Sequence, residues 1–212
     1  MAAIVETGEN SAGSATATGG KGNTIFGPEH IGHLQMDVSA HICPKIFIRE
    51  LQFVFPAENL TDIVCIPTMQ FARTDLVNVG DDIEVEKDRL LERFMATAKV
   101  LCDEFIAAGY WSDYIDPCSG LPMLNQTCNK VFSEVDGAEQ LLGYSVMNAG
   151  CCKVLLHPQW GSAVYPASLF TKAPTDVVVE KLSMLRDGAF DTRIEGELAK
   201  LIAAVQASNP SS

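Results

Sequence analysis

The chain has 212 residues, of which 47% are hydrophobic and 20% are charged, and its formal net charge is −12. This composition is typical of a globular protein, and its apolar runs are shorter than the roughly 18–20 residues that a membrane helix needs. The acidity argues against a nucleic-acid partner, because phosphate binding depends on clustered Lys and Arg. We therefore expect a folded domain with neither nucleic acid nor membrane as its partner.

The two ends of the chain differ in composition from the rest. Residues 1–30 are predicted as a flexible low-complexity tail, residues 31–206 as a single folded domain and residues 207–212 as a flexible C-terminus. No apolar signal-peptide core is visible, and the first arginine is Arg49, which disfavours a mitochondrial presequence. With seven cysteines then expected as reduced thiols, these features predict a cytoplasmic protein.

In the first half of the domain, the sequence predicts two helices and a strand between them. Pro44 can open a helix at its first turn, and Pro56 closes that segment. "LTDIVCIPTMQF", residues 60–71, is typical of a buried strand. Residues 86–109 repeat apolar side chains at steps of three and four, which predicts a long helix with Gly109 as its C-terminal glycine.

The second half predicts further strands and then two C-terminal helices. "GCCKVLLHP" and "SAVYPASLFTKA" flank the turn "PQWGS", which predicts an antiparallel hairpin. Thr192 and Glu195 form a capping-box signature for the last helix. Because hairpins rather than βαβ crossovers connect the expected strands, the fold class is α+β.

The adjacent cysteines in "NAGCCKVLLH" are candidates for a chemical role. Successive side chains of a strand point to opposite faces. Cys152 shares its face with the apolar Val154 and Leu156, which predicts a core position. Cys151 shares its face with Lys153, Leu155 and His157, which predicts an open position. The nearby ammonium favours the thiolate form of Cys151. The residues alone leave Cys151 open between an inert thiol, a soft metal ligand and a nucleophile.

Other arrangements of these residue types are less favoured. Cys118 and Cys128 are too far apart for one zinc knuckle, and the adjacent cysteines are too close together. A nucleophile pair of Cys151 and His157 needs a bend, because a straight strand separates them by roughly 20 Å.

Carboxylates and histidines elsewhere have simpler interpretations. Asp113 and Asp116 are expected on opposite faces of a strand-like stretch, so they cannot jointly flank a bond. Asp116 is better explained as a turn former before Pro117. His30 and His33 are expected to be exposed polar residues.

Three stretches resemble one known family. They are "VEKDRLLERFMATAKVLCDEFIAAGYW", "AGYWSDYIDPCSGLPM" and "LGYSVMNAGCCKVLLHPQWGSAVYPASLFTKA". Together they closely resemble the C-terminal domain of the methylmalonic aciduria and homocystinuria type D family, from about residue 36 to 173. The run G-C-C-K-V followed by H-x-x-W-G is the distinctive part.

The resemblance implies a fold and a role. It implies a nitroreductase-like antiparallel sheet with flanking helices, and an intracellular trafficking adaptor for vitamin B12 (cobalamin) rather than an enzyme. Such a protein forms a heterodimer with the type C cobalamin-processing protein and shares cobalamin with it, without binding B12 or flavin alone. The first cysteine of the motif, Cys151, would ligate the cobalt as a thiolate.

The resemblance also implies a destination for the cofactor. It is methionine synthase in the cytosol, with methylmalonyl-CoA mutase as an open alternative. A thiol- or flavin-dependent reductase of the nitroreductase type is the competing hypothesis, which the scarcity of Lys and Arg disfavours in its flavin form.

Overall fold

The structure, a computed structural model of the chain, describes residues 23–125, 130–150 and 152–208. Its centre is a five-stranded antiparallel sheet with the strand order β1-β2-β3-β7-β4. The strands of this sheet are β1 (Thr24–Ile31), β2 (Met36–Ile42), β3 (Val64–Phe71), β4 (Ser112–Tyr114) and β7 (Val164–Thr171). The sheet and the helices that flank it confirm the α+β class, while the likeness to nitroreductases stays a prediction.

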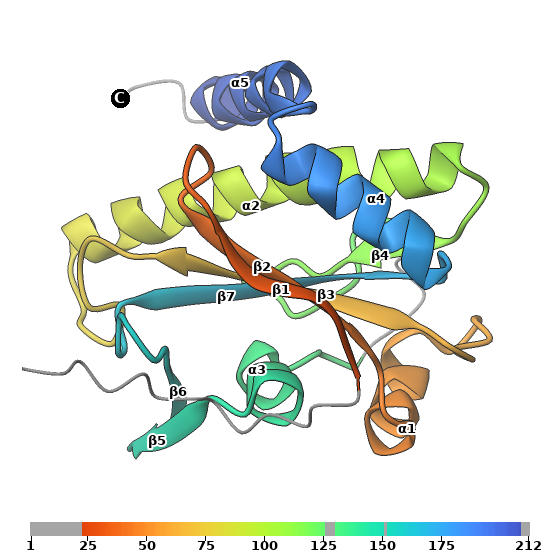
Figure 1. The fold of residues 1–212 in the computed structure, drawn as a ribbon. Coiled ribbons are helices and arrows are strands. Elements are labelled where there is room, and N and C mark those ends of the chain that lie inside the picture. The colour runs from red at the N-terminus through yellow and green to blue at the C-terminus, as the bar shows by residue number, and fades with distance from the viewer. Residues whose placement is uncertain (1–22, 126–129, 151, 209–212) are drawn as a thin grey trace, which may run out of the picture.

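Helices cover both faces of the sheet (Figure 1). One face carries α2 (Asp81–Ala107) and α4 (Thr175–Arg186), with α5 (Asp191–Ser208) packed on α2; the other face carries α1 (Lys45–Val54) and α3 (Glu134–Leu142). The predicted long helix is confirmed as part of α2, and Gly109 follows it with φ +89°. Both C-terminal helices are confirmed too, although α5 already begins at Asp191, before the predicted capping box.

The central strands are buried on both sides, because each side chain points to one of two helical layers. In β3, Val64 and Ile66 belong to the core beneath α2, whereas Cys65 belongs to the core beneath α1. The same alternation in β7 sends Leu169 to the α2 side and Phe170 to the α1 side. The strand predicted at residues 60–71 is thus confirmed from Val64 to Phe71, and the first helix is confirmed too, with Pro44 as its N-terminal cap.

The predicted boundary of the N-terminal tail is wrong. Residues 1–22 lie outside the described residues, but Thr24–Ile31 form β1, whose Phe26 and Ile31 are buried in the core. The pairing with β2 is irregular around Gly27 and Pro28, which hides the strand pattern in the sequence. Gly27 has φ +64°, and a Cβ there would lie 2.3 Å from the Val38 carbonyl oxygen. At the other end, α5 continues past the predicted boundary at residue 206.

The predicted hairpin across "PQWGS" is also wrong. β6 (Cys152–Leu156) pairs with β5 (Ser145–Ala149) in a separate two-stranded sheet, whereas β7 joins the central sheet between β3 and β4. The turn itself exists, since His157 and Gly161 exchange backbone hydrogen bonds of 2.8 and 2.9 Å. Beyond this bridge the chain leaves β6, because β7 finds its partner in β3, about a hundred residues earlier.

Candidate functional site

The cysteine pair lies at the end of the β5–β6 hairpin. Ala149 pairs with Cys152, and Gly150 follows Ala149 with φ +64°, a conformation that glycine adopts readily. Apart from the chain neighbours of Gly150, no atom of the described residues lies within 4 Å of the position that a Cβ would take there, so the end of the hairpin is open at this residue. Cys151, the predicted cobalt ligand, lies outside the described residues, and its role stays a prediction.

Cys152 was predicted in the core, and this is wrong. It is exposed, whereas Leu155 and His157 on the alternate face of the strand are only 3% and 4% exposed. The alternation was predicted, but the buried side is the opposite one. The reason is that β6 packs through Leu155 onto α3 and β7, while Cys152 lies where the hairpin leaves the body of the protein.

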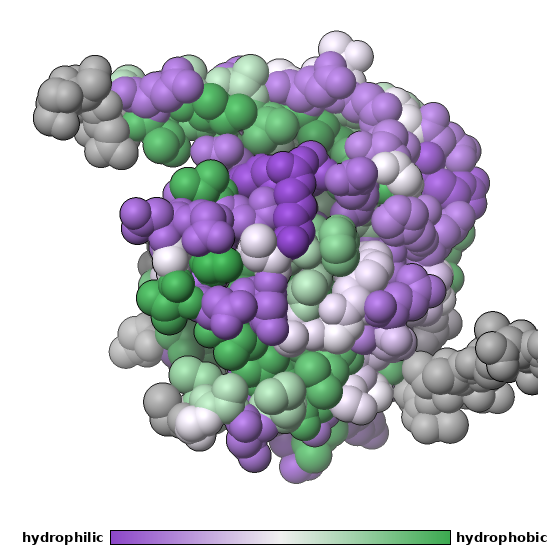
Figure 2. Space-filling view, turned by 90° about the vertical axis from the view of Figure 1, so that its left-hand side faces the viewer, coloured by the Kyte–Doolittle hydropathy of each residue, from purple (hydrophilic) through white to green (hydrophobic). Residues whose placement is uncertain are grey.

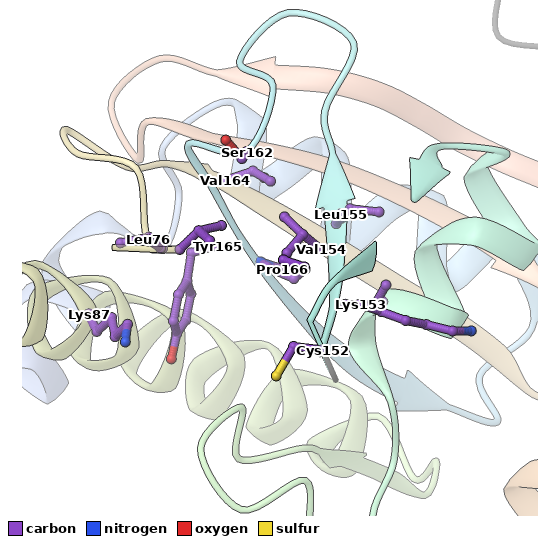
Figure 3. Close-up of a pocket in the computed structure, with 13 residues that line it drawn as sticks. Leu76, Lys87, Cys152, Lys153, Val154, Leu155, Ser162, Val164, Tyr165 and Pro166 are labelled. Atoms are coloured by element: carbon purple, nitrogen blue, oxygen red, sulfur yellow. The ribbon is translucent and has the colours of Figure 1, made fainter. Parts of the chain in front are cut away.

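Cys152 borders a pocket between the hairpin, β7 and the start of α2 (Figure 3). The cavity measures about 410 Å³. Its walls are mostly aliphatic, with Leu76, Val135, Val154, Val164 and Pro166 among the lining residues. The aromatic ring of Tyr165 forms another wall, and the Cys152 sulfur and the Tyr165 hydroxyl point in a similar direction. No sequence pattern predicts this pocket, because its walls come from segments that are distant along the chain.

Two lysines border the pocket, and both are paired with carboxylates. Lys153 Nζ lies 2.7 Å from Asp136 on α3 and points away from the pocket in Figure 3. This hydrogen bond lowers the pKa of Asp136. Lys87 Nζ lies 2.8 Å from Glu84. The Lys153 ammonium, which was expected to favour the thiolate form of Cys151, is therefore already paired with the carboxylate of Asp136.

His157 belongs to a different cluster, at the far end of β6. Its ring stacks on Trp160 at 3.9 Å between centroids, and its Nε2 lies 3.3 Å from Asp37. The other carboxylate oxygen of Asp37 lies 2.6 Å from Nδ1 of His30. Burial alone would raise the pKa of Asp37, but the interactions with both histidines outweigh it and lower that pKa. These partners give His157 a structural role, and its pairing with Cys151 stays untested.

The acidic pair behaves as two separate structural groups. Asp113 is fully buried in β4, and its carboxylate accepts backbone hydrogen bonds from Met123, Leu124 and Asn125 at 2.9–3.1 Å. Asp116 accepts the N–H groups of the two residues after Pro117, which confirms it as a turn former. The expected exposure of His30 and His33 is also confirmed.

Most other described cysteines are structural. Cys43, Cys65 and Cys102 are buried, and burial raises the pKa of Cys43 and of Cys102 to about 12. Among the described residues, no group of three or more His, Cys, Asp and Glu side chains is arranged to hold a metal ion. In the same part of the chain, no helix combines the length and apolarity needed to cross a membrane. The chemistry within reach of the hairpin is thus that of thiols beside an apolar pocket.

Comparison with known proteins agrees with the motifs. The family model of the methylmalonic aciduria and homocystinuria type D protein matches residues 2–183. The chain is 35% identical to the cobalamin trafficking protein CblD of Rattus norvegicus, 34% to that of Mus musculus and 33% to that of Homo sapiens, each over 150 residues. These alignments cover 70% of this chain and 51% of each relative, so the chain spans about half the length of the curated relatives that it matches. The chain belongs to the methylmalonic aciduria and homocystinuria type D protein family.

Proposed function

We propose that this protein is a cobalamin trafficking adaptor, and that Cys151 ligates the cobalt of a cobalamin presented by a second protein. The observation that carries the proposal is the match over 150 residues to proteins named for cobalamin trafficking. The resemblance to this family includes the motif G-C-C-K, and the first cysteine of that motif is Cys151 in this chain. Because the matched segment covers only 51% of each relative, the proposed role concerns the part of them to which this segment corresponds.

The chemistry of the hairpin fits a shared site. Cobalt in a corrin already has its equatorial ligands, so a single soft thiolate suffices as an axial ligand. The end of the hairpin is open at Gly150, which leaves room for a bulky group to approach the backbone. A thiol at such a position can meet a cofactor that another protein holds.

The cavities of this chain favour a partner that carries the corrin. Two cavities of the described part measure about 410 and about 490 Å³. Pockets for drug-sized ligands span about 300–1,000 Å³, and cobalamin is much larger than a drug. We therefore propose the type C cobalamin-processing protein as a heterodimer partner, and methionine synthase as the destination, with methylmalonyl-CoA mutase as an alternative recipient. In this role the chain binds and passes on a cofactor and is not an enzyme.

A titration followed by visible absorption tests the proposal. Type C protein loaded with cob(II)alamin is mixed with the parent chain, with Cys151→Ala and with Cys152→Ala. We expect a new thiolate-type spectrum that disappears for Cys151→Ala and largely survives Cys152→Ala. Since Cys152 is itself exposed, loss of the spectrum only for Cys152→Ala would move the ligand to that residue. Unchanged spectra for both variants would refute cobalt ligation by either thiol.

The colour and the turnover of the purified protein distinguish the adaptor from the competing reductase. A flavin enzyme would purify with yellow absorption, whereas the adaptor is expected to be colourless. A thiol-dependent reductase would consume a disulfide or a cobalamin substrate with turnover. The adaptor would form one complex per chain, without turnover.

A further inference from the structure

The pocket beside the cysteine pair directly adjoins the end of the hairpin. Ala149 and Cys152, the paired residues that close the hairpin, both line it. A partner that contacts the end of the hairpin at Ala149 and Cys152 would therefore also border the pocket. This inference rests on the proposed function, since it takes Cys151 as the meeting point of the two proteins.

One face of the hairpin supplies an apolar surface to this region. Residues that pair across an antiparallel ladder share a face, and so do residues two apart along a strand. Met147 pairs with Val154, and Ala149 pairs with Cys152, so these four side chains lie on the same face. Met147 is 44% exposed. The hairpin thus presents a continuous surface of small and aliphatic groups next to the pocket.

The opposite rim of the pocket is apolar as well. Val77 lines the pocket and is 43% exposed, and the same segment carries the exposed Val79 and Val85. Figure 2 views the side of the molecule where β5, β6 and the start of α2 lie, and apolar residues gather in its lower half. Single exposed apolar residues are common on protein surfaces, but Val77 and Met147 are exposed on two segments that meet at or beside a concave apolar site, and such a combination is typical of an interaction surface.

Charge also favours a protein surface over a small anion in this pocket. The chain as a whole carries −12, yet the two lysines that border the pocket each pair with a carboxylate. The site is therefore locally close to neutral, and an apolar group can enter it without facing an unpaired charge. Interfaces are commonly anchored in this way, by an apolar side chain that fills a pocket near the centre of the contact.

We propose that this pocket, bounded by Leu76, Val77, Cys152, Val154 and Val164, is the docking site for an apolar side chain of the protein that presents cobalamin to Cys151. The occupant is an aliphatic or aromatic side chain on the partner's surface, next to its corrin. Docking at the pocket holds the partner while the adjoining thiolate reaches the cobalt. Association and cobalt ligation are then two separable properties of neighbouring residues.

Calorimetric titration against the type C protein loaded with cob(II)alamin tests the docking site. Val77→Asp and Val154→Asp put a charge into the pocket, and we expect each to weaken association by about tenfold or more, as loss of a buried interface anchor does. Val205→Asp is the matched control, because Val205 is 50% exposed and lies on α5, none of whose residues lines the pocket. It is expected to bind as the parent does. Circular dichroism on each variant checks the fold.

Chemical labelling supplies a measurement that needs no change in the pocket. In a Cys151→Ser variant, N-ethylmaleimide modification of Cys152 is followed by peptide mass spectrometry. We expect the cobalamin-loaded partner to slow this modification at least several-fold, because the docked side chain covers the thiol. An unchanged rate in the saturated complex would overturn the docking site.

The outcomes separate the docking site from the proposed function. If both pocket variants bind like the parent while Cys151→Ala still loses the thiolate spectrum, the docking site is wrong and cobalt ligation stands. If the pocket variants lose affinity while Cys151→Ala keeps the spectrum, docking stands and the ligand assignment fails. Equal weakening by Val205→Asp would show a general effect of charge and would also overturn the pocket.

Discussion

Glu134, in the first turn of α3, accepts two hydrogen bonds from Ser168 on β7. The Ser168 backbone N–H lies 3.1 Å from one carboxyl oxygen, and the Ser168 hydroxyl lies 2.5 Å from the other. This pair fixes the helix to the central sheet. The same helix supports β6 through the cluster around Leu155, so the position of the reactive hairpin depends on this contact.

The Glu134 carboxyl makes stability depend on pH. Burial raises its pKa from 4.5 to about 7. Between these values the folded state binds more protons than the unfolded state, so stability falls as the pH rises through this window. We expect Glu134→Gln to remove a loss on the order of 2 kcal/mol between pH 5 and pH 8. Urea denaturation at both pH values measures it, and parallel losses in parent and variant would contradict the assignment.

His41 on β2 produces the opposite dependence. Its ring lies 3.1 Å from the Thr24 hydroxyl and 2.9 Å from the Ser39 hydroxyl, and burial lowers its pKa from 6.5 to about 4. The unfolded state binds more protons between these values, so stability rises with pH from 4 to 6.5. Replacement by Gln should flatten this part of a thermal-melting profile, by an amount on the order of 2 kcal/mol at pH 4. A variant whose melting temperature still falls as steeply on acidification would rule out His41 as the cause.

How much of this fold follows from the sequence depends on whether the interactions are local. The helix around Phe94, Leu101 and Phe105 is predictable, because its apolar spacing and Gly109 lie within one segment. The pairing partner of β7 cannot be predicted in this way, because β3 lies about a hundred residues away and no pattern in either strand indicates that the two pair. A local turn at residues 157–161 was therefore extended into a hairpin that does not form.

In the candidate site, too, only the features that depend on local sequence can be predicted. Strand alternation separates Cys152 from Lys153, and the motif identifies the family. Which face is buried depends on α3 and β7, which pack onto Leu155, and the number of apolar residues on each face does not predict this packing. The pocket has no sequence signal at all, since Leu76, Val135 and Val164 meet only in the folded chain.

Asp113 should be the acidic residue that matters most for the loop after β4. Its buried carboxylate accepts three backbone N–H groups of residues 123–125, so Asn would place an amide donor where only acceptors fit. We expect Asp113→Asn to lower the free energy of unfolding by about 2–3 kcal/mol. Asp116→Asn, in an exposed turn, should cost less than about 1 kcal/mol. Urea titrations and hydrogen exchange at Met123 and Leu124 measure both, and equal costs would contradict the difference in burial.

Gly150 offers a test of how the hairpin holds the cysteine pair. Its φ of +64° disfavours residues with a Cβ, yet among the described residues no atom beyond its chain neighbours lies within 4 Å of the place where a Cβ would stand. Gly150→Ala should therefore cost only the backbone strain, about 1–2 kcal/mol, with no steric clash. Asn tolerates this conformation better than Ala, so Gly150→Asn should recover part of the loss.

These two variants also connect the backbone to the proposed chemistry. If the positive φ is what presents Cys151, the thiolate spectrum with the cobalamin-loaded type C protein should weaken for Gly150→Ala and recover for Gly150→Asn. Thermal melting measured on the same samples separates loss of fold from loss of presentation. Equal stability and equal spectra for Ala and Asn would mean that the conformation at residue 150 does not control the reactive cysteine.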